Sequence, residues 1–298
     1  MRILFDNVQF NSRSGPNSFG KKLAVALSHR GHTIVNEDED PDVQLTFIQT
    51  VANHAKRLVQ RLDGVWFNVD QDWQAQNQLL FLTFKAADAV IAQSNFDLQL
   101  IEKFFGHHDN ITVIPNGTDK EFVESIELMS VPQLVGVEKV WSCASDWRPH
   151  KRLVDNVRYF QEHAGSKDCL VIAGANAMNS YRVADPRVFY AGDLQYPQLL
   201  SLMRSSDVFL HLAWLDHCPN VVIDAQAAGC HIICSSTGGT AEIAGPDSTV
   251  IEEEPWDFTP VKLYEPPVMD FTRKRKGEGG DVSDIADTAV LYERVLKG

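Results

Sequence analysis

The chain has 298 residues, 44% of them hydrophobic, which is enough for ordinary buried cores in one large domain or two modest ones. This hydrophobic content excludes disorder as the main state. The formal net charge of −13 argues against a nucleic-acid-binding protein and against attachment to a membrane surface, because both need clustered Lys and Arg.

The start of the chain shows no sign of targeting. Only residues 3–5 form an apolar run before Asp6, which is too short for a secretory signal. Elsewhere, no apolar run approaches the ~20 residues of a membrane-spanning helix. We therefore expect a cytoplasmic protein without a membrane span.

The five cysteines are an odd count, and at least three lie in or beside apolar strand-like runs. This pattern predicts buried, reduced thiols and not a disulfide framework. Cys230, His231 and Cys234 are metal-ligand types, but a fourth ligand at a suitable spacing is missing. No metal site is predicted there.

Short runs of β-branched and aromatic residues alternate with stretches of helical period along the first half. Strands that alternate with helices predict a parallel, doubly wound sheet. The predicted strands are residues 2–5, 43–48, 64–69, 89–94 and 111–115.

A loop that holds Gly15 joins the first strand to a helix that ends at Gly31. Gly15-Pro16 is compatible with a simple turn or with close approach of the backbone to a ligand. Gly15 and Gly20 have the spacing of a phosphate-binding P-loop. Lys21 is followed by another Lys, where that motif needs Ser or Thr, so a P-loop is excluded.

The alternation begins again after Asn116-Gly117. It gives a second set of strands at residues 138–145, 168–174, 187–192, 208–213 and 231–236. We therefore predict an α/β chain of two Rossmann-like, doubly wound parallel-sheet domains, with a cleft between them as the default binding site and a boundary within 117–137. The predicted parts are an N-terminal domain, a C-terminal domain and a last helical segment that packs back on the first domain, at residues 1–120, 121–281 and 282–298.

Residues 254–281 are rich in Pro, Gly and charge, which predicts an irregular surface segment. The basic run 273–276 within it is interpreted as a solvated loop, because short charge runs usually are. A binding patch is the alternative.

The segment 214–243 is predicted to run loop, helix, strand and loop. Pro219 suits the first turn of the helix, and Gly229 suits its end. The first amides of this helix, near Asn220 and Val221, lie at the positive end of its dipole. They would therefore attract a phosphate group.

Two acids and a pair of glycines complete this segment. Asp216 and Asp224 have seven residues between them, and Gly238-Gly239 follows the next strand, where it lets the backbone approach a ligand closely. A purely structural interpretation is that Asp216 caps the helix start and Asp224 solvates a helix face.

With these residues the segment resembles retaining glycosyltransferase family 4, also called group 1, which carries Glu-x7-Glu, a helix, a Gly stop, a strand and a Gly-Gly-x-x-Glu loop. The resemblance implies a GT-B fold and a nucleotide-diphosphate sugar as donor. It also implies that Asp216 hydrogen-bonds hydroxyls of the donor sugar and that Asp224 binds the ribose diol. Both positions carry Asp where the family has Glu, so each carboxylate is one methylene shorter.

Residues 143–157 resemble the family segment in which an Arg and a Lys clamp the diphosphate. Lys151 stands at the position of the family lysine, but Asp146 replaces the arginine five residues earlier, so Arg148 is the predicted substitute. Cations are needed there because negative charge grows on the leaving diphosphate as the glycosidic bond breaks. An exposed loop with a lysine at a helix start is the alternative.

Three further contacts with the donor are implied by the resemblance. Residues 189–213 resemble the region that frames the base, which implies contacts from the backbone near Gly192 and Leu194. The loop at Gly15 would face the diphosphate. Residues 87–106 and 113–119 also resemble family segments, and with them the resemblance extends over most of the chain.

The first domain also departs from the family. A His that contacts the donor sugar is expected near the end of the strand 64–69, but this sequence has Asn68 and Asp70 there. Arg61, Asp63 and Asp70 are predicted to line the acceptor side.

The implied reaction moves a sugar from the donor to a saccharide or other hydroxyl acceptor with retention of configuration, without a metal or a further cofactor. Asp216 then positions the donor and is not a nucleophile. Two alternatives stay open. One is a non-catalytic nucleotide-sugar-binding protein, and the other is a metal-dependent GT-A transferase with ligands in Asp70-Gln71-Asp72 or Asp38-Glu39-Asp40.

Overall fold

The computed structural model describes residues 1–129 and 136–298, in two compact units that each have a sheet and a core. The first unit comprises Met1–Asp119, Asp257–Val261 and Ser283–Gly298, and the second comprises Lys120–Trp256 and Lys262–Val282. The stretch 117–137, where we predicted the domain boundary, includes residues 130–135, which lie outside the described part of the chain.

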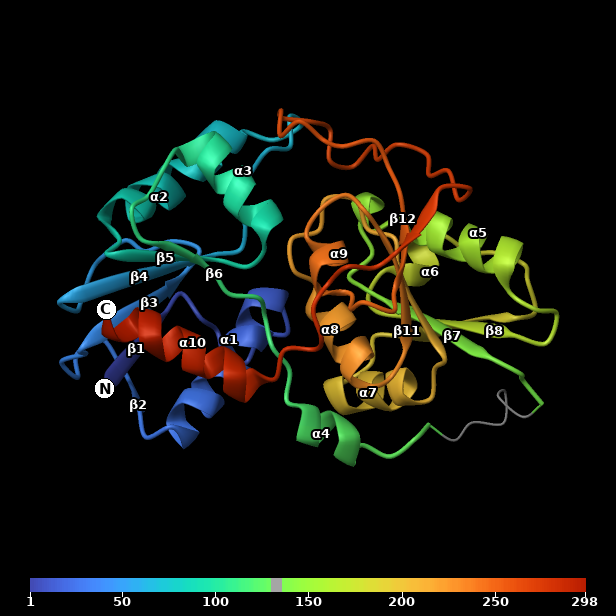
Figure 1. Cartoon of the computed structure of the whole chain (residues 1–298), viewed down its shortest axis with the longest axis horizontal. Coiled ribbons are helices and arrows are strands. Elements are labelled where there is room, and N and C mark those ends of the chain that lie inside the picture. The colour runs from blue at the N-terminus through green and yellow to red at the C-terminus, as the bar shows by residue number, and fades with distance from the viewer. Residues whose placement is uncertain (130–135) are drawn as a thin grey trace. The chain divides into compact units, whose positions relative to one another are not determined.

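The first unit is a six-stranded parallel sheet of order β2-β1-β3-β4-β5-β6, with helices between its strands (Figure 1). Its elements are β1 (Arg2–Asp6), α1 (Gly15–His29), β2 (Thr33–Val35), β3 (Val43–Phe47), β4 (Arg57–Leu62), α2 (Trp73–Ala86), β5 (Ala89–Ala92), α3 (Asn95–Phe105), β6 (Ile111–Val113) and α10 (Ile285–Lys297).

Helix α1 shows how the sequence directs this packing. Phe19, Leu23 and Leu27 recur every four residues and are fully buried against the sheet. Gly20 allows the helix to approach Val8 closely, because a Cβ there would lie 3.0 Å from Cγ1 of Val8. Gly31, at φ +83°, follows the helix in the left-handed conformation that glycine favours.

The predicted strand at residues 64–69 is wrong, and β4 lies at Arg57–Leu62 instead. The β4 sequence contains two arginines and a glutamine, which conceal a buried strand from a reading based on hydrophobicity. Gln60 and Arg61 are nevertheless fully buried, because polar partners surround their side chains. Beyond Gly64, Asn68 forms only an isolated bridge to Val261.

The C-terminal helix α10 belongs to the first unit. Ala289, Tyr292 and Leu296 are buried in the same core as α1, and the rings of Tyr292 and Phe19 lie 5.8 Å apart. The chain also reaches this unit at Asp257–Val261, which the sequence did not indicate.

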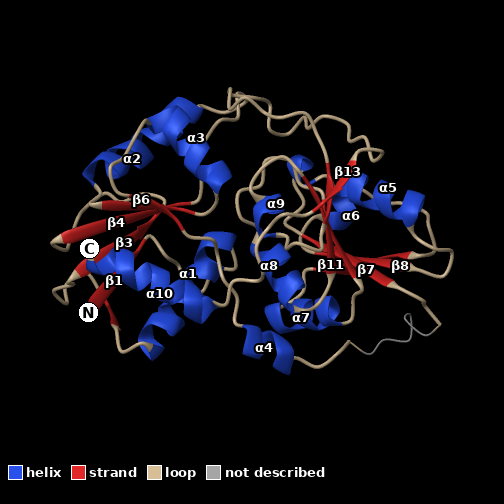
Figure 2. Cartoon of the chain, viewed as in Figure 1, coloured by secondary structure: helices blue, strands red, loops and turns tan. Residues whose placement is uncertain are grey.

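The second unit is a seven-stranded sheet of order β13-β12-β11-β10-β7-β8-β9, parallel except for β13 (Figure 2). Its elements are α4 (Lys120–Ser125), β7 (Val140–Ala144), a 3-10 turn (Pro149–Lys151), α5 (Leu153–His163), β8 (Cys169–Ala173), α6 (Ala177–Ser180), β9 (Val188–Gly192), α7 (Tyr196–Arg204), β10 (Val208–His211), α8 (Asn220–Ala227), β11 (His231–Ser235), α9 (Thr240–Ile243), β12 (Thr249–Ile251) and β13 (Lys274–Lys276). The predicted pair of doubly wound α/β sheets is confirmed.

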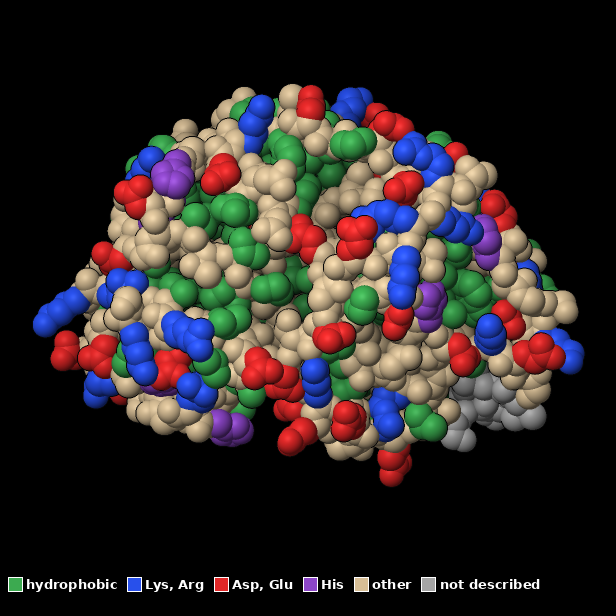
Figure 3. Space-filling model, viewed as in Figure 1, with side chains coloured by type: hydrophobic (Ala, Val, Ile, Leu, Met, Phe, Trp, Pro, Cys, Tyr) green, Lys and Arg blue, Asp and Glu red, His purple; other side chains and the backbone are tan. Residues whose placement is uncertain are grey.

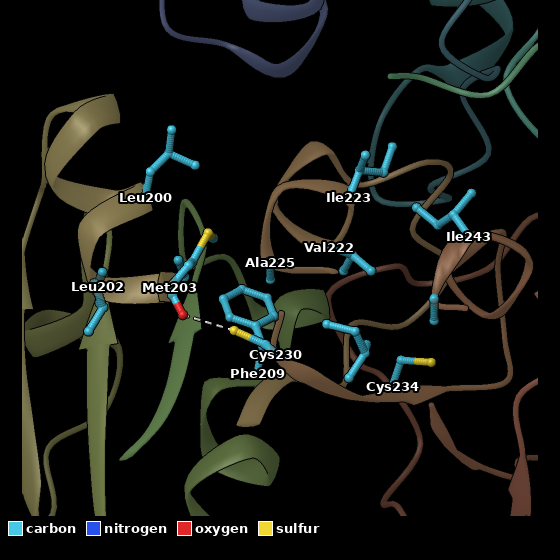
Figure 4. Close-up of a cluster of buried hydrophobic side chains, with 14 of the residues drawn as sticks. Leu200, Leu202, Met203, Phe209, Val222, Ile223, Ala225, Cys230, Cys234 and Ile243 are labelled. Atoms are coloured by element: carbon cyan, nitrogen blue, oxygen red, sulfur yellow. Dashed lines mark hydrogen bonds between the residues drawn. The ribbon is translucent and has the colours of Figure 1, made fainter. Parts of the chain in front are cut away.

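Apolar packing fixes α8 against this sheet. Val222 and Ala225 of α8 are fully buried and lie with Phe209 of β10 and Met203 of α7 in one cluster, shown in Figure 4. The thiol of Cys230, just beyond α8, donates to the Met203 carbonyl at 3.1 Å. Burial of an apolar side chain the size of Val contributes roughly 1.5–3 kcal/mol, so this packing stabilises α8 against the sheet.

The segment predicted as irregular contains the antiparallel edge strand β13, so that prediction is wrong for residues 274–276. The basic side chains here have acidic neighbours. Arg273 pairs with Glu254 at 2.6 Å, and Lys276 pairs with Asp247 at 3.0 Å. These pairs show that the basic run has acidic partners, and on the face shown in Figure 3 Lys and Arg side chains are generally interspersed with Asp and Glu.

Candidate active site

The order of the second sheet places two loops at its switch point. Strands β7 and β10 are neighbours, although the chain between them forms β8 and β9 on the far side of β7. Loops that leave the carboxyl ends of such strands diverge and leave a crevice, which is where open α/β sheets bind ligands. Lys151 follows β7 and Asp216 follows β10, so both predicted site residues lie in these loops.

Lys151 and Asp216 form a direct ion pair at this switch point. The Lys151 Nζ lies 2.6 Å from Oδ2 of Asp216, and the two side chains are only 18% and 12% exposed. The alternative of an exposed loop lysine is therefore wrong. A third group, His211 at the end of β10, places its Nε2 2.8 Å from the same carboxylate oxygen.

The electrostatics of these groups follow from burial and from their contacts. Burial alone would raise the pKa of the Asp216 carboxyl, but the Lys151 charge and the His211 hydrogen bond outweigh burial and hold this pKa well below its usual range. Burial lowers the pKa of His211. The Asp216 carboxyl is therefore ionised at neutral pH, and burial favours the neutral imidazole of His211.

Left-handed backbone flanks both partners of the ion pair. Arg152, directly after Lys151, has φ +53°, and Leu215, directly before Asp216, has φ +56°. Non-glycine residues in this region carry local strain on the order of 1–3 kcal/mol, which persists only where the surroundings fix it. Such strain is concentrated at functional sites, so its position supports a functional role for this pair.

Buried polar contacts hold the loops that carry this strain. The Arg152 side chain is fully buried and donates to Glu253 at 2.7 Å and to the carbonyl of Pro267 at 2.9 Å. Glu253 also accepts from Thr237 at 2.6 Å, next to the glycine pair. The turn after β7 is thereby tied to the loop after β11.

Gly238 and Gly239 contact the backbone of Asp216. Gly238 has φ +96°, and a Cβ there would lie 2.5 Å from the carbonyl oxygen of Asp216. The amide of Gly239 donates to that same oxygen at 2.8 Å. The close approach expected of a ligand is thus made in this structure by the Asp216 backbone, which the two glycines support.

Helix α8 begins beside this loop. Its N-cap is Pro219 and its first residues are Asn220 and Val221, so the predicted start is correct within one residue. Asp216 is not the N-cap residue, and its Oδ1 accepts instead from the amide of His217 at 3.1 Å. The first turn of α8 therefore follows directly on the loop of the Lys151–Asp216 pair, in the orientation that attracts anions.

Asp224 lies within α8 and is 2% exposed, so it does not solvate a helix face. The hydroxyl of Tyr196, at the start of α7, donates to its Oδ1 at 3.1 Å. The ring of Tyr196 stacks on Phe122, with centroids 6.2 Å apart. Sequence reasoning missed Tyr196, because only the fold brings α7 beside α8.

Arg148 lies on the same turn as Lys151 but is more exposed, with 56% of its side chain accessible. Its Nη2 lies 3.2 Å from Oδ2 of Asp146, the residue that replaces the family arginine. Asp146 also accepts from Asn176 at 3.2 Å. The Asp146 carboxylate therefore holds Arg148, the side chain that we predicted to substitute for the family arginine.

The remaining predicted donor residues lie at two places. Gly192 ends β9 at φ +72° and its carbonyl accepts from the amide of Gly174 at 2.7 Å, while Leu194 packs on the core of the second unit. Gly15 is the first residue of α1 in the first unit, directly before Pro16. Their contacts with a donor stay predictions.

Arg61 does not line an acceptor site. Its fully buried guanidinium lies 4.5 Å from the Phe19 ring and donates to Asn116 at 2.7 Å and to Tyr292 at 3.0 Å. It also pairs with Asp63. This arginine is a structural centre of the first unit, which its position in an unrecognised strand concealed.

No group of His, Cys, Asp and Glu side chains suited to a metal ion occurs among residues 1–129 and 136–298. Burial raises the pKa of the Cys230 and Cys234 thiols to about 12, which disfavours the thiolate form that binds metals. Asp72, one of the candidate D-x-D ligands, caps α2 by accepting from Ala75 at 3.0 Å. The two separate sheets also differ from the single continuous domain expected of a GT-A transferase.

Comparison with known families supports the expectation for the second unit. Residues 141–259 match the model of the family described as glycosyl transferases group 1. The match covers less than half of the chain. The group 1 segment contains Lys151, Asp216 and Asp224, so the predicted resemblance is confirmed. The chain matches none of the curated proteins.

Solved structures show the same fold over nearly the whole chain. Anabaena HepE in complex with UDP-glucose superposes with a TM-score of 0.64 at 13% identity, covering 99% of this chain and 95% of that one. AviGT4, a glycosyltransferase involved in avilamycin A biosynthesis, gives 0.63 at 16% identity, covering 100% and 97%. Sucrose-phosphate synthase from Thermosynechococcus elongatus gives 0.62 at 12% identity, covering 100% and 90%. The fold is therefore GT-B.

In the described part of the chain, no helix combines the length and apolar character needed to cross a bilayer.

Proposed function

We propose that the protein transfers a sugar from a nucleotide-diphosphate sugar to an acceptor hydroxyl, with retention of configuration and without a metal ion. The observation that carries this proposal is the pairing of Lys151 and Asp216 at the switch point of a group 1 domain, beside the start of α8. This arrangement supplies one cation and one helix N-terminus for a diphosphate.

The Lys151 ammonium would stabilise the charge that grows on the leaving diphosphate. The Lys151 ammonium pairs with Asp216 at 2.6 Å, so an incoming diphosphate must compete with this carboxylate for Lys151. Asp216 would then accept hydrogen bonds from hydroxyls of the donor sugar. Arg148, on the same turn, would add a second cation if it left Asp146.

Asp224 and Tyr196 would bind the nucleoside. An Asp at this position is a methylene shorter than the family's Glu and is 2% exposed, so it is poorly placed to reach a ligand unaided. The Tyr196 hydroxyl, 3.1 Å from Asp224, can donate to that carboxylate and still accept from a ribose hydroxyl.

A nucleotide-sugar-binding protein without transfer activity is a second candidate. It is favoured by the replacement of both family glutamates and of the arginine, now Asp146, whose carboxylate holds Arg148. Measured transfer or donor hydrolysis would exclude it, whereas donor binding without turnover would support it.

The proposal is tested first by thermal shift with UDP, GDP and ADP and their glucose derivatives, starting with UDP-glucose because HepE was solved with it. A ligand that binds the folded state raises the Tm. We expect one nucleotide to do so, and Asp224→Asn to abolish the shift. Asp247→Asn, at an exposed carboxylate of the same unit, should keep the full shift.

A full shift in the Asp224→Asn variant would overturn the role given to Asp224, and no shift with any nucleotide would contradict the proposal. Turnover of the bound donor is then followed with and without EDTA, and the anomeric configuration of the product is determined by NMR. Loss of activity in EDTA would contradict the metal-independent mechanism, and an inverted anomer would contradict retention.

A further inference from the structure

His211 is a polar residue at the end of an otherwise apolar strand, and its environment is unusual. The side chain is 5% exposed, and Nε2 lies 2.8 Å from Oδ2 of Asp216. A carboxylate oxygen only accepts hydrogen bonds, so this nitrogen carries the proton. Burial of a His at this position therefore requires the partner that Asp216 provides.

The same oxygen also holds Lys151, at 2.6 Å. A lysine has a flexible four-carbon stem and a charge without directional preference, so its position depends on what fixes its partner. The other oxygen of Asp216 accepts from the amide of His217 at 3.1 Å. The carboxylate is thus held by its own loop through Oδ1 and by β10 through Oδ2.

We propose that His211 is a positioning residue: its Nε2–H fixes the Asp216 carboxylate, which in turn places the Lys151 ammonium in the crevice for a diphosphate. This inference rests on the proposed function. It adds to that function a residue that does not touch the donor and that acts through Asp216.

The neutral state of His211 suits this role. Asp216 and Lys151 are the charged groups that act on it, and burial, the largest influence, lowers its pKa. A neutral donor orients the carboxylate without adding a positive charge that would compete with Lys151 for the ligand. The hydrogen bond also helps to keep Asp216 ionised.

The test compares three variants by titration with UDP across a range of pH. His211→Leu removes the donor and should weaken binding on the order of tenfold, the value of one hydrogen bond to a charged group. It should also move the loss of binding at acid pH to higher pH, because the Asp216 carboxylate loses a stabilising contact. His211→Gln retains an N–H and should restore both the affinity and the acid limit, which is the pH at which binding is lost on acidification.

His231→Gln is the matched control. His231 lies on the neighbouring strand β11 but at its opposite end, where Nε2 is 3.0 Å from Thr249. It should bind UDP as the wild type does. The Tm of each variant shows that it is folded under the conditions of the titration.

Two results would overturn the inference. One is unchanged binding and acid limit in His211→Leu. The other is equal weakening in His211→Gln and His211→Leu with an unmoved acid limit, since a merely structural role predicts that pattern.

A measurement without ligand separates this inference from the proposed function. In ¹⁵N-histidine spectra, His211, assigned by its loss in His211→Gln, should show the Nε2–H tautomer and should titrate below the ordinary pKa of a histidine. Asp216→Ala should change that signature. An Nδ1–H tautomer or titration near the ordinary pKa would contradict the role of His211 even if UDP binds, whereas the expected spectrum with no nucleotide binding would contradict only the proposed function.

Discussion

His150, next to Lys151, shows how one buried residue makes the folding stability depend on pH. Its ring is 8% exposed and stacks on Tyr264 with centroids 5.6 Å apart, and burial lowers its pKa from 6.5 to about 3. The unfolded chain takes up a proton as the pH falls below 6.5, whereas the folded chain does so only near pH 3. Stability is therefore lost as the pH falls through this interval.

We expect His150→Phe, which keeps the aromatic stack, to remove this dependence. Between about pH 7 and about pH 4 the wild type should lose about 3 kcal/mol more unfolding free energy than the variant. Urea denaturation at the two pH values measures the difference. His107→Gln, at an exposed histidine of the first unit, should leave the slope unchanged, and parallel curves for wild type and His150→Phe would show that His150 is protonated in the folded state.

At this scale, the sequence predicted Lys151 and Asp216 as members of one site, and the structure pairs them, whereas the sequence misjudged Arg61. Both cases depend on the same rule, that buried charge needs a partner. Asp216 follows an apolar strand within a recognisable motif. Arg61 finds Asn116 and Tyr292 only through the fold, and these are 55 and 231 residues away in sequence.

At the scale of elements, the loop after β11 depends on Gly238. A Cβ there would collide with the carbonyl oxygen and the amide nitrogen of Asp216, at 2.5 and 2.8 Å, in a backbone conformation with φ +96°. Gly229, which follows α8 at φ +91°, has a similar conformation, but a Cβ there would meet nothing within 4 Å. A comparison of the two glycines thus separates the steric clash of a Cβ from the strain of a left-handed backbone conformation.

We expect Gly238→Ala to destabilise the protein by on the order of 3 kcal/mol or more and to abolish nucleotide binding, because the Asp216 backbone must shift. Gly229→Ala should lose only about 1 kcal/mol and keep binding. Urea denaturation and the nucleotide thermal shift measure both effects. Equal losses in the two variants would mean that the left-handed conformation, and not the contact with Asp216, explains Gly238.

On the scale of the whole molecule, the C-terminal helix completes a unit that begins at the N-terminus. Tyr292 of α10 is fully buried against Phe19 and accepts from Arg61, whereas Leu291 beside it is 40% exposed. Phe19 and Tyr292, which lie far apart in the sequence, therefore share one core.

We expect Tyr292→Ala to lower the unfolding free energy by about 3–5 kcal/mol, through the cavity and the unpaired Arg61 donor. Leu291→Ala should change it by less than about 0.5 kcal/mol. Limited proteolysis should cut the first unit of Tyr292→Ala before the second. Similar stability of the two variants would show that α10 contributes little to this core.

The sequence by itself determined the alternation of strands and helices, the start and end of α8, and the segment that carries Lys151, Asp216 and Asp224. These depend on local periodicity, on Pro and Gly at helix ends, and on short spacing, which are all written in neighbouring residues. Only the tertiary structure decided that β4 is a strand, that Lys151 and His211 meet on one oxygen of Asp216, and that the glycine pair supports the Asp216 backbone. Those facts arise where strands that are distant in sequence become neighbours in a sheet, because a buried polar group takes its partner from whatever the fold places beside it.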